Sequence, residues 1–404
     1  MKSTSKPGFG TKSPSRIMPA LGVPAPVLLA VTGMSPAILT ETIWALSQEP
    51  DPIIPVRIIV VTTSDGRREL ERQLFTPDPI LQGVTPWDAL RGSLAAAGHD
   101  LRGLLRFGTT GDDVRVITCT DAATGRTREL ADLRTPSDNA AAADFLLEQV
   151  RGIVENPDTR LIASLAGGRK TMGALLYACL SLAGRETDRL THVLVNEPFD
   201  TLRGFWFPGQ PSSTLPDRTG KPHDPAQARV EMADVPFVPL RNLFHRELGR
   251  KAGSFLKLVD ECREQVRRTA GEAVRLTIEQ SRCEIEVNGT GVRLAPREHL
   301  LLLCLATRAK QGEPALGSYK DAITVVDEFR AHLTRSAPAR NLADWRHGTA
   351  LQQSFNDDQE MRRALSSLDK KLREAGGNAH LLAPCLPEKG RFSLTVPAEL
   401  IFVR

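Results

Sequence analysis

The sequence predicts an α/β protein, with a Rossmann-like domain built on a parallel sheet and a smaller α+β domain after it. Apolar runs of strand length, such as residues 27–31 and 57–62, alternate with segments of helical character. These runs are apolar throughout, which is typical of parallel strands covered by helices on both faces. After about Phe237 the pattern changes to short strands and charged helices, which predicts a second domain.

The elements of the first domain alternate in order along the chain. Pro136 and Ser137 give start signals for its longest helix, which carries Asp138 in the first turn. A further helix follows Gly66. The predicted strands are residues 27–31, 57–62, 114–118, 161–164 and 191–195, and the other predicted helices are residues 37–48, 138–153 and 174–183.

In the second domain, strands are predicted over residues 274–278, 283–287 and 292–294, with Asn288-Gly289 as a turn. Helices are predicted over residues 299–309 and 360–375, and a hairpin around residues 388–390. The whole chain then divides into a disordered leader (1–24), the Rossmann-like domain (25–208), a linker and connector helix (209–272) and the second domain (273–404).

Composition narrows the function classes. The net charge of +4 permits a polyanionic partner without requiring one, and aromatic residues at 5% are too few for a surface that stacks many bases. Six scattered cysteines without a C-x-x-C pair predict reduced thiols rather than a zinc site. No apolar run reaches the roughly 18 residues of a membrane span, so the sequence predicts a cytoplasmic protein without a membrane partner.

The most informative motif is residues 164–173, Ser-Leu-Ala-Gly-Gly-Arg-Lys-Thr-Met-Gly, between a predicted strand and a predicted helix. Glycines allow close backbone approach, and the first N–H groups and the dipole of a helix attract an anion. Arg169 and Lys170 add two positive charges. The spacing is not that of a Walker A loop, so phosphate binding is predicted without ATPase activity. The alternative is a tight turn with solvated cations.

Polar loops also follow the first two predicted strands, at residues 32–35 and 63–66. Because the carboxyl ends of parallel strands lie at one edge of a sheet, these loops are expected to converge with residues 166–171. Each hydroxyl alone is also a common helix or turn cap. The predicted ligand contacts are Gly33, Met34, Thr63, Ser64, Ala166, Gly167, Gly168, Arg169 and Thr171.

Four stretches together have a family resemblance. They are Leu28-Leu29-Ala30-Val31-Thr32-Gly33-Met34-Ser35-Pro36, Asp132-Leu133-Arg134-Thr135-Pro136, residues 164–173, and Asp188-Arg189-Leu190-Thr191-His192-Val193-Leu194-Val195. In this order they resemble the CRISPR-associated Rossmann-fold (CARF) proteins, and among them the CRISPR-associated ring nucleases. The resemblance covers roughly residues 25–208.

The resemblance implies a homodimer whose paired sheets bind cyclic oligoadenylate, the second messenger of type III CRISPR systems, with the tetra-adenylate favoured over the hexa-adenylate. It implies ring cleavage without metal or cofactor, by in-line attack of a ribose 2′-OH on the adjacent phosphodiester. Lys170 is then expected to stabilise charge on the phosphoryl oxygens, and Ser35 or Thr32 to position the ring.

The second domain resembles a winged helix-turn-helix domain of the OmpR type. The matching pieces are Val287-Asn288-Gly289, residues 292–298, residues 361–372 and Gly390-Arg391-Phe392-Ser393-Leu394. DNA contact is the corresponding expectation, and a solvated charged helix is the alternative. The candidate contacts are Arg362, Arg363, Lys370, Lys371 and Arg373.

Three functions remain open from the sequence. The first is a ring nuclease of a type III CRISPR system. The second is a regulator that binds the same messenger without cleaving it and contacts nucleic acid through the winged helix. The third is a ligand-activated HEPN-type ribonuclease, because the segment from Arg340 to His347 loosely matches the Arg…His pattern of that domain.

Overall fold

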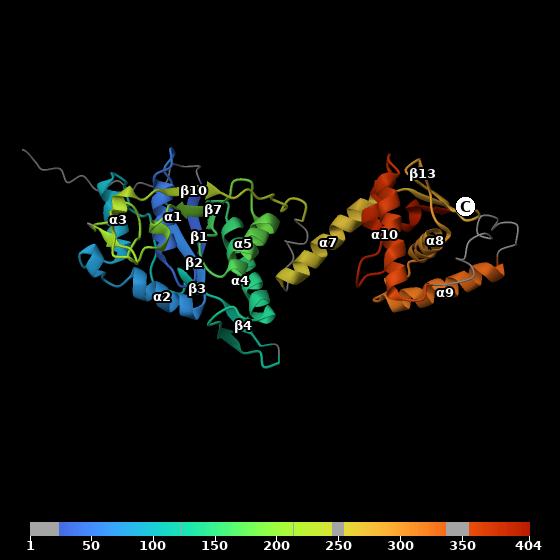
Figure 1. Cartoon of the computed structure of the whole chain (residues 1–404), viewed down its shortest axis with the longest axis horizontal. Helices are drawn as coiled ribbons and strands as arrows, with labels where there is room; N and C mark the ends of the chain where they lie inside the picture. Colours follow the sequence, from blue (N-terminus) through green and yellow to red (C-terminus); the bar gives the residue numbers. More distant parts are fainter. Residues whose placement is uncertain (1–23, 122, 213, 245–253, 337–354) are drawn as a thin grey trace, which may run out of the picture. The chain divides into compact units, whose positions relative to one another are not determined.

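The computed structural model describes residues 24–121, 123–212, 214–244, 254–336 and 355–404. The chain divides into two compact units, Met1–Leu258 and Val259–Arg404 (Figure 1). All but the last residue of the expected leader, and the whole Arg340–His347 pattern, lie outside the described residues.

The first unit is built on a six-stranded sheet in the order β10-β7-β6-β1-β2-β3. The five strands from β7 to β3 run parallel to one another, and β10 runs antiparallel to β7 at one edge of the sheet. The strands are β1 (Ala25–Val31), β2 (Arg57–Thr62), β3 (Val114–Val116), β6 (Thr159–Ser164), β7 (Arg189–Val195) and β10 (Val230–Asp234).

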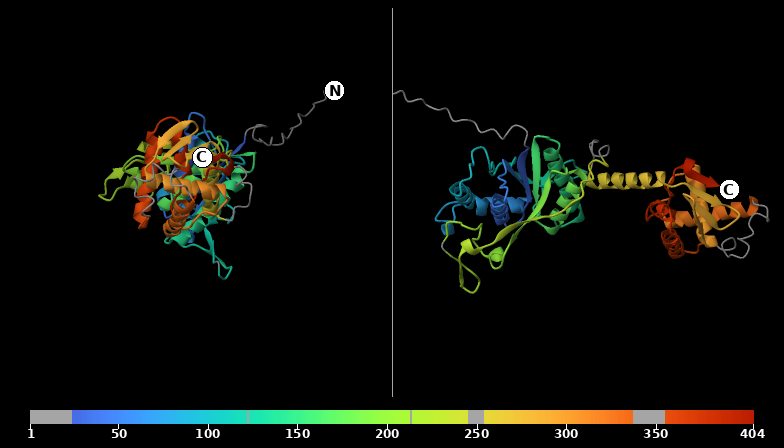
Figure 2. Two further views of the ribbon diagram at one scale, coloured as in Figure 1. Left: turned by 90° about the vertical axis from the view of Figure 1, so that its right-hand side faces the viewer. Right: turned by 90° about the horizontal axis from the view of Figure 1, so that it is seen from above.

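Helices cover both faces of this sheet. They are α1 (Ala37–Ser47), α2 (Ser64–Leu74), α3 (Pro86–Ala96), α4 (Pro136–Val154) and α5 (Lys170–Ala183). In Figure 2 the blue helices and the green helices flank the strands from opposite sides. Leu28 and Ile58 of the strands pack with Ile43 and Leu90 of α1 and α3 into one core cluster. The apolar strands predicted from the sequence are therefore buried as expected for this class.

Start signals in the sequence coincide with caps in the structure. The Thr135 hydroxyl accepts the N–H of Asp138, and the Asp138 carboxylate accepts the N–H of Thr135, which forms a capping box at α4. Pro136 occupies the first helical position. The helix therefore begins two residues before the predicted Asp138.

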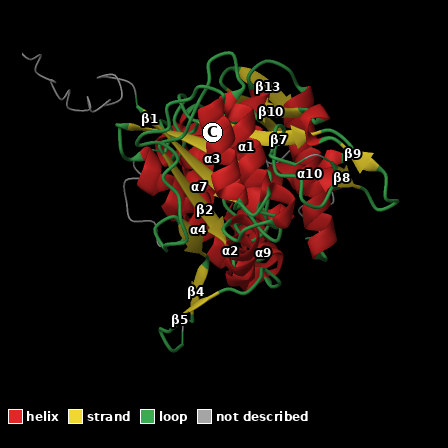
Figure 3. Ribbon diagram, turned by 90° about the vertical axis from the view of Figure 1, so that its left-hand side faces the viewer, coloured by secondary structure: helices red, strands yellow, loops and turns green. Residues whose placement is uncertain are grey.

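Residues 209–272, expected to form a linker and connector, contain folded elements. Two short strands, β8 (Leu215–Pro216) and β9 (Pro222–His223), pair with each other, and β10 joins the main sheet. Helix α7 (Phe255–Glu272) follows. Another two-stranded ribbon, β4 (Thr118–Thr120) with β5 (Thr127–Glu129), projects away from the main sheet (Figure 3).

The second unit has a four-stranded sheet in the order β13-β12-β11-β14, with three long helices. Its core joins the sheet to the helices through residues such as Leu276, Leu301 and Leu368. The elements are β11 (Leu276–Glu279), β12 (Glu284–Val287), β13 (Thr290–Arg293), α8 (Pro296–Lys310), α9 (Tyr319–Ser336), α10 (Asp358–Glu374) and β14 (Ile401–Val403).

The predicted α/β fold class is confirmed by this architecture. The hairpin predicted around residues 388–390 is present in a minimal form. Glu388 and Arg391 form an antiparallel bridge with mutual backbone bonds, and Thr395 donates its N–H to the carbonyl of Cys385 at 3.1 Å. The pairing is short because Phe392 after the turn pairs with Leu316 and residues 379–385 before it form a 3₁₀ helix.

Candidate ligand site at the carboxyl edge of the sheet

The sheet has a topological switch point between β1 and β6. From β1 the chain proceeds to β2 and β3 on one side, and later returns to β6 on the other side. Ligands of open α/β sheets bind in the crevice outside the carboxyl ends of the strands at such a point. The loops at this point are residues 32–36 after β1 and residues 165–169 after β6, and we use the word crevice for the sheet edge between them.

Glycines hold these two loops together. A Cβ on Gly33 would lie 3.3 Å from Cα of Gly168, and a Cβ on Gly167 would lie 2.7 Å from the carbonyl oxygen of Val31. Gly168 also has φ of +78°, a left-handed conformation that favours glycine. Gly33 and Gly167 therefore serve contact between two backbones of the protein, whereas the sequence suggested close approach to a phosphate.

Helix α5 begins at this crevice. Arg169 is its N-cap residue, and no side chain of the described residues caps it. Lys170, the first residue of the helix, and Thr171 after it are both exposed. The Lys170 ammonium has no hydrogen bond or ion pair within the described residues. An uncapped helix N-terminus beside a free cation is suited to bind an anion.

Arg169 behaves differently from Lys170, and its expected role as a free ligand contact needs correction. Its guanidinium makes a two-pronged ion pair with Asp132, with Nε 2.9 Å from Oδ1. Arg134 contacts the same carboxylate at 3.1 Å. Hydrogen bonds from Arg169, and then from Arg134, hold the pKa of Asp132 well below its usual range. The charge of Arg169 is therefore already balanced.

The ion pair between Arg169 and Asp132 brings a third segment, residues 130–135, to the crevice. Leu130 accepts the backbone N–H of Ser64 at 2.9 Å, at the start of α2, and residues 131–135 lead from there to α4. The segment thus contacts both the loop after β2 and, through Asp132, the loop after β6. The sequence motif identified this segment, but it did not pair Asp132 with Arg169.

The predicted hydroxyl contacts separate into two groups. Thr32 is fully buried and its hydroxyl donates to the carbonyl of Ser35, so a catalytic role for Thr32 is not supported. Thr63 is buried and caps α2 by accepting the N–H of Gly66. In contrast, Ser35 is exposed and Ser64 is half-buried.

The remaining predicted contacts lie at the same edge. Met34 is 61% exposed, which is high for an apolar side chain, and Ala166 is half-buried. Two arginines of the neighbouring helix α2 are paired within the protein. Arg67 makes a two-pronged pair with Glu129 at 3.0 and 2.7 Å, and Arg68 bonds Asp65. Among the predicted contacts, the exposed side chains without an ion pair in the described residues are therefore Met34, Ser35, Lys170 and Thr171.

One buried acid of this unit was not singled out by sequence reasoning. Glu41, in the second turn of α1, is 7% exposed and has no hydrogen-bond partner within the described residues. Burial raises the pKa of its carboxyl to about 7, and the charge of Asp200 adds to the increase. Sequence alone gives no sign of this, because the burial is a property of the folded unit.

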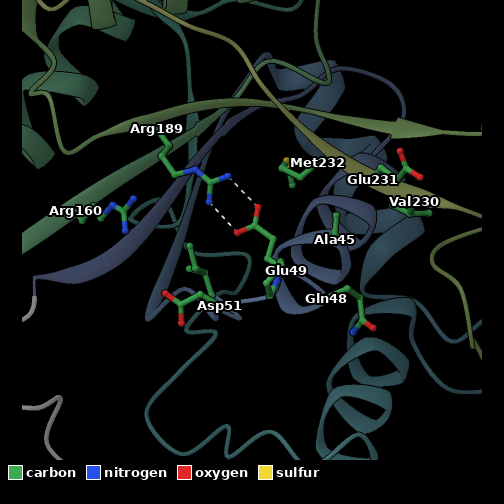
Figure 4. A pocket seen from close by; sticks show the side chains of 11 residues that line it. Ala45, Gln48, Glu49, Asp51, Arg160, Arg189, Val230, Glu231 and Met232 are labelled. Atoms are coloured by element: carbon green, nitrogen blue, oxygen red, sulfur yellow. Dashed lines mark hydrogen bonds and ion pairs between the residues drawn. The ribbon is translucent and has the colours of Figure 1, made fainter.

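A pocket of about 600 Å³ lies elsewhere on the first unit, beside the amino-terminal ends of β6 and β7 (Figure 4). Figure 4 shows Arg189 directed at Glu49, with both bonds at 2.9 Å, and Asp234 contacts Arg189 from β10 at 2.8 Å. Arg189 is therefore neutralised by two carboxylates. Because this pocket is at the opposite edge from the α5 N-terminus, it does not share the anion-binding features of the crevice.

The predicted nucleic-acid contacts on α10 are mostly paired, which corrects the view of this helix as a free basic surface. Within the described residues, Arg363 is the one member without an ion pair. Lys371 bonds Glu298 at 2.6 Å, and that carboxylate is 6% exposed. The other pairs are Arg362 with Asp358 at 3.9 Å, Lys370 with Glu374 at 3.8 Å and Arg373 with Asp369 at 2.9 Å.

Glu298 explains why Lys371 is structural. Its carboxylate accepts the Ser367 hydroxyl at 2.6 Å and the N–H of Ala295 at 2.8 Å, in addition to Lys371. It therefore ties the start of α8 to α10. Arg362 also stacks over the ring of Tyr319 at 4.8 Å, which fixes it to α9.

These observations define an α/β protein in which an uncapped helix N-terminus lies at the switch point of a mainly parallel sheet. Residues 35–267 match the family model of CRISPR-associated protein NE0113, which is more than half of the chain. The chain belongs to this family of CRISPR-associated proteins, and the predicted link to CRISPR systems is confirmed.

Comparison with solved structures finds similarity to the structure of a type III CRISPR defence DNA nuclease activated by cyclic oligoadenylate. The identity is 15% and the TM-score 0.23, with 86% of this chain and 34% of that nuclease covered. The chain thus spans about a third of the nuclease's length, and a TM-score this low shows no shared overall fold. No curated protein matches the chain. Among the described helices, none combines the length and apolar character that crossing a bilayer requires.

Proposed function

We propose that the crevice between the loops after β1 and β6 binds cyclic oligoadenylate and that the protein cleaves the ring, as an accessory protein of a type III CRISPR system. Membership of a CRISPR-associated family supports the setting, and the resemblance to ring nucleases supplies the ligand. The observation that carries the proposal is Lys170, an exposed cation without a partner in the described residues at an uncapped helix N-terminus.

In the proposed reaction a ribose 2′-oxygen forms a bond to the adjacent phosphorus, and the bond from that phosphorus to the 5′-oxygen breaks. The 2′-OH gives up its proton and the departing 5′-oxygen takes one from solvent. The products end in a 2′,3′-cyclic phosphate and a 5′-OH. Lys170 and the N–H groups of α5 stabilise charge on the phosphoryl oxygens, and Ser35 positions the ring. Thr32, being buried, has no part in this version.

The proposed assembly is a homodimer in which two copies of the crevice face one ring. A twofold arrangement suits a ring of four identical nucleotides. The 61% exposure of Met34, an apolar side chain on the loop after β1, supports burial of this edge against a base or a second subunit.

A second candidate function is sensing without cleavage. Asp144 of α4 accepts the N–H of Phe255 at 2.6 Å, at the first residue of α7. The segment that pairs with Arg169 leads directly into α4, so the proposed site and the start of α7 are both linked to this helix. A sensor would use this connection to regulate the second unit. The Arg340–His347 pattern of the ribonuclease alternative lies outside the described residues, so it adds no support here. For DNA contact through α10, Arg363 is the candidate cation without an ion pair in the described residues.

The test is to incubate the purified protein with cyclic tetra-adenylate and cyclic hexa-adenylate in EDTA and to separate the products by chromatography. Linear products that end in 2′,3′-cyclic phosphate establish ring cleavage without metal. Intact ring that co-elutes with the protein supports the sensor. Absence of both binding and cleavage overturns the proposal.

A further inference from the structure

A second pocket adjoins the crevice. It has a volume of about 380 Å³ and is formed by residues 131–138, at the start of α4, together with Arg128 of β5. It shares Asp132 with the crevice, because that carboxylate bonds Arg169 at the N-cap of α5. One ion pair therefore separates the pocket from the turn that carries Lys170.

Two guanidinium groups of this pocket are open to solvent. The side chain of Arg134 is 77% exposed and that of Arg128 is 66% exposed. Arg134 gives one N–H to Asp132, at 3.1 Å, and Arg128 forms an ion pair with Asp138 at 3.9 Å, which is too long for a hydrogen bond. Since a guanidinium has five N–H donors, most donors of both side chains are free to bind an anion.

The carboxylates beside these arginines are already satisfied. Asp132 is held by Arg169, and Asp138 accepts the backbone N–H groups of Arg134 and Thr135 at 3.1 and 3.0 Å. Both are largely buried, at 15% and 11% exposure. The lining therefore holds two arginines and two carboxylates, and the carboxylates are occupied by these bonds while the remaining N–H donors of Arg128 and Arg134 face solvent.

We infer that this pocket is a second phosphate subsite for the same ligand, in which Arg128 and Arg134 bind a phosphodiester beyond the one at Lys170. The inference rests on the proposed function of the crevice. It predicts preference for an oligonucleotide with several phosphates over a mononucleotide, because only the longer ligand reaches both positive centres. Arginine suits this role because its planar fork matches two phosphate oxygens.

The test compares Arg128→Ala with Arg126→Ala in binding of cyclic tetra-adenylate and of adenosine monophosphate. Arg126 is an exposed arginine of the same ribbon that does not line the pocket, so it controls for loss of one charge. Arg128→Ala is expected to weaken ring binding about three- to tenfold and to lower the salt dependence of log K by about 0.7, as for one lost phosphate contact. Monophosphate binding is expected to be unchanged in both variants.

Arg134→Ala serves as a second variant, and its thermal unfolding is compared with wild type because Arg134 also contacts Asp132. Equal ring affinity in wild type, Arg128→Ala and Arg134→Ala overturns the subsite. A wild-type protein that binds no ring overturns the proposed function itself. Ring binding that is weakened by Lys170→Ala, but by neither arginine variant, leaves the crevice in place and removes the subsite alone.

Discussion

The first turn of α5 and the helix α10 both concentrate positive charge, and they use it in different ways. At α5, Lys170 has no ionic partner within the described residues and adjoins an uncapped helix N-terminus. On α10, four of the five candidate cations are paired with acids of the same unit. The count of basic residues is therefore a poor guide to anion binding, and the charge left without an acidic partner is a better one.

Two buried glutamates show the same contrast. Glu298 in the second unit accepts three hydrogen bonds and ties α8 to α10. Glu41 in the first unit is nearly as buried and accepts none within the described residues. A buried carboxyl costs free energy unless donors satisfy it, so Glu298 stabilises its unit through its three hydrogen bonds, whereas burial raises the pKa of Glu41 and favours its protonated form.

The largest expected effect concerns Lys170. We expect Lys170→Ala to lower ring turnover by roughly 10²–10³-fold, as for removal of one group that stabilises an oxyanion. Lys370→Ala, which removes an exposed, ion-paired lysine of the second unit, is the matched control and is expected to leave turnover unchanged. Single-turnover rates with cyclic tetra-adenylate check both. Equal rates in Lys170→Ala and wild type would show that the unpaired charge of Lys170 does not contribute to turnover.

The pH dependence of stability tests Glu41. Its folded pKa of about 7 lies above the model-compound value of 4.5, so the stabilisation from its bound proton is present below about pH 4.5 and is lost as pH rises through about 7. The difference between these values corresponds to roughly 3 kcal/mol at most. Wild type is expected to lose roughly 2–3 kcal/mol more unfolding free energy than Glu41→Gln between pH 5 and pH 8.

Urea unfolding followed by tryptophan fluorescence measures this, because three of the four tryptophans, Trp44, Trp87 and Trp206, lie in the first unit. Other titrating groups act in both proteins and cancel in the comparison. Parallel pH profiles for wild type and Glu41→Gln would show that the carboxyl is better satisfied than its contacts indicate.

Lys371 is expected to matter for stability and not for ligand. Lys371→Ala removes a donor from the buried Glu298, and we expect a loss of about 2 kcal/mol in the second unit, reduced by the partial exposure of the lysine. Lys370→Ala is expected to change stability by less than about 0.5 kcal/mol. Calorimetric unfolding of wild type, Lys371→Ala and Lys370→Ala provides the measurement. Equal unfolding temperatures would show that the bond from Lys371 to Glu298 contributes no more stability than an exposed ion pair.

The smallest effect is expected at Asp132. Asp132→Asn removes the charge that balances Arg169, and the loss of stability is expected to be small because the Arg169 side chain is 60% exposed. Ring affinity is expected to rise by about two- to fivefold, because a paired cation at the site becomes a free one. Titration of labelled cyclic tetra-adenylate checks this. Weaker binding in the variant would show that Asp132 itself contacts the ligand.

Much of the fold could be predicted because its determinants are local. The apolar runs that became β1, β2, β6 and β7, and the Pro136 start of α4, were readable from neighbouring residues. The edge strand β10 was not, since it is short, half-exposed and lies in a segment rich in turn residues. Its place depends on the antiparallel partner β7 that the folded sheet supplies.

The sheet edge at which the candidate residues lie could be predicted, and the contacts of each residue less well. Convergence of the loops follows from strand order. The structure makes Lys170 the exposed first residue of α5, four residues before the predicted helix start at Ala174. The partners of Arg169, Arg67 and Lys371 lie 37, 62 and 73 residues away in sequence, so their neutralisation required the tertiary structure. The buried state of Thr32 could not be read from a loop sequence either.

In the proposed function, the unpaired charge of Lys170 at the start of α5 binds the phosphates of the ring. The most direct measurement is the affinity of cyclic tetra-adenylate over a range of salt concentrations for wild type, Lys170→Ala and Lys370→Ala. We expect the slope of log K against log salt to fall by about 0.7 in Lys170→Ala and to stay unchanged in Lys370→Ala. An unchanged slope in Lys170→Ala, or an equal fall in both variants, would contradict the account.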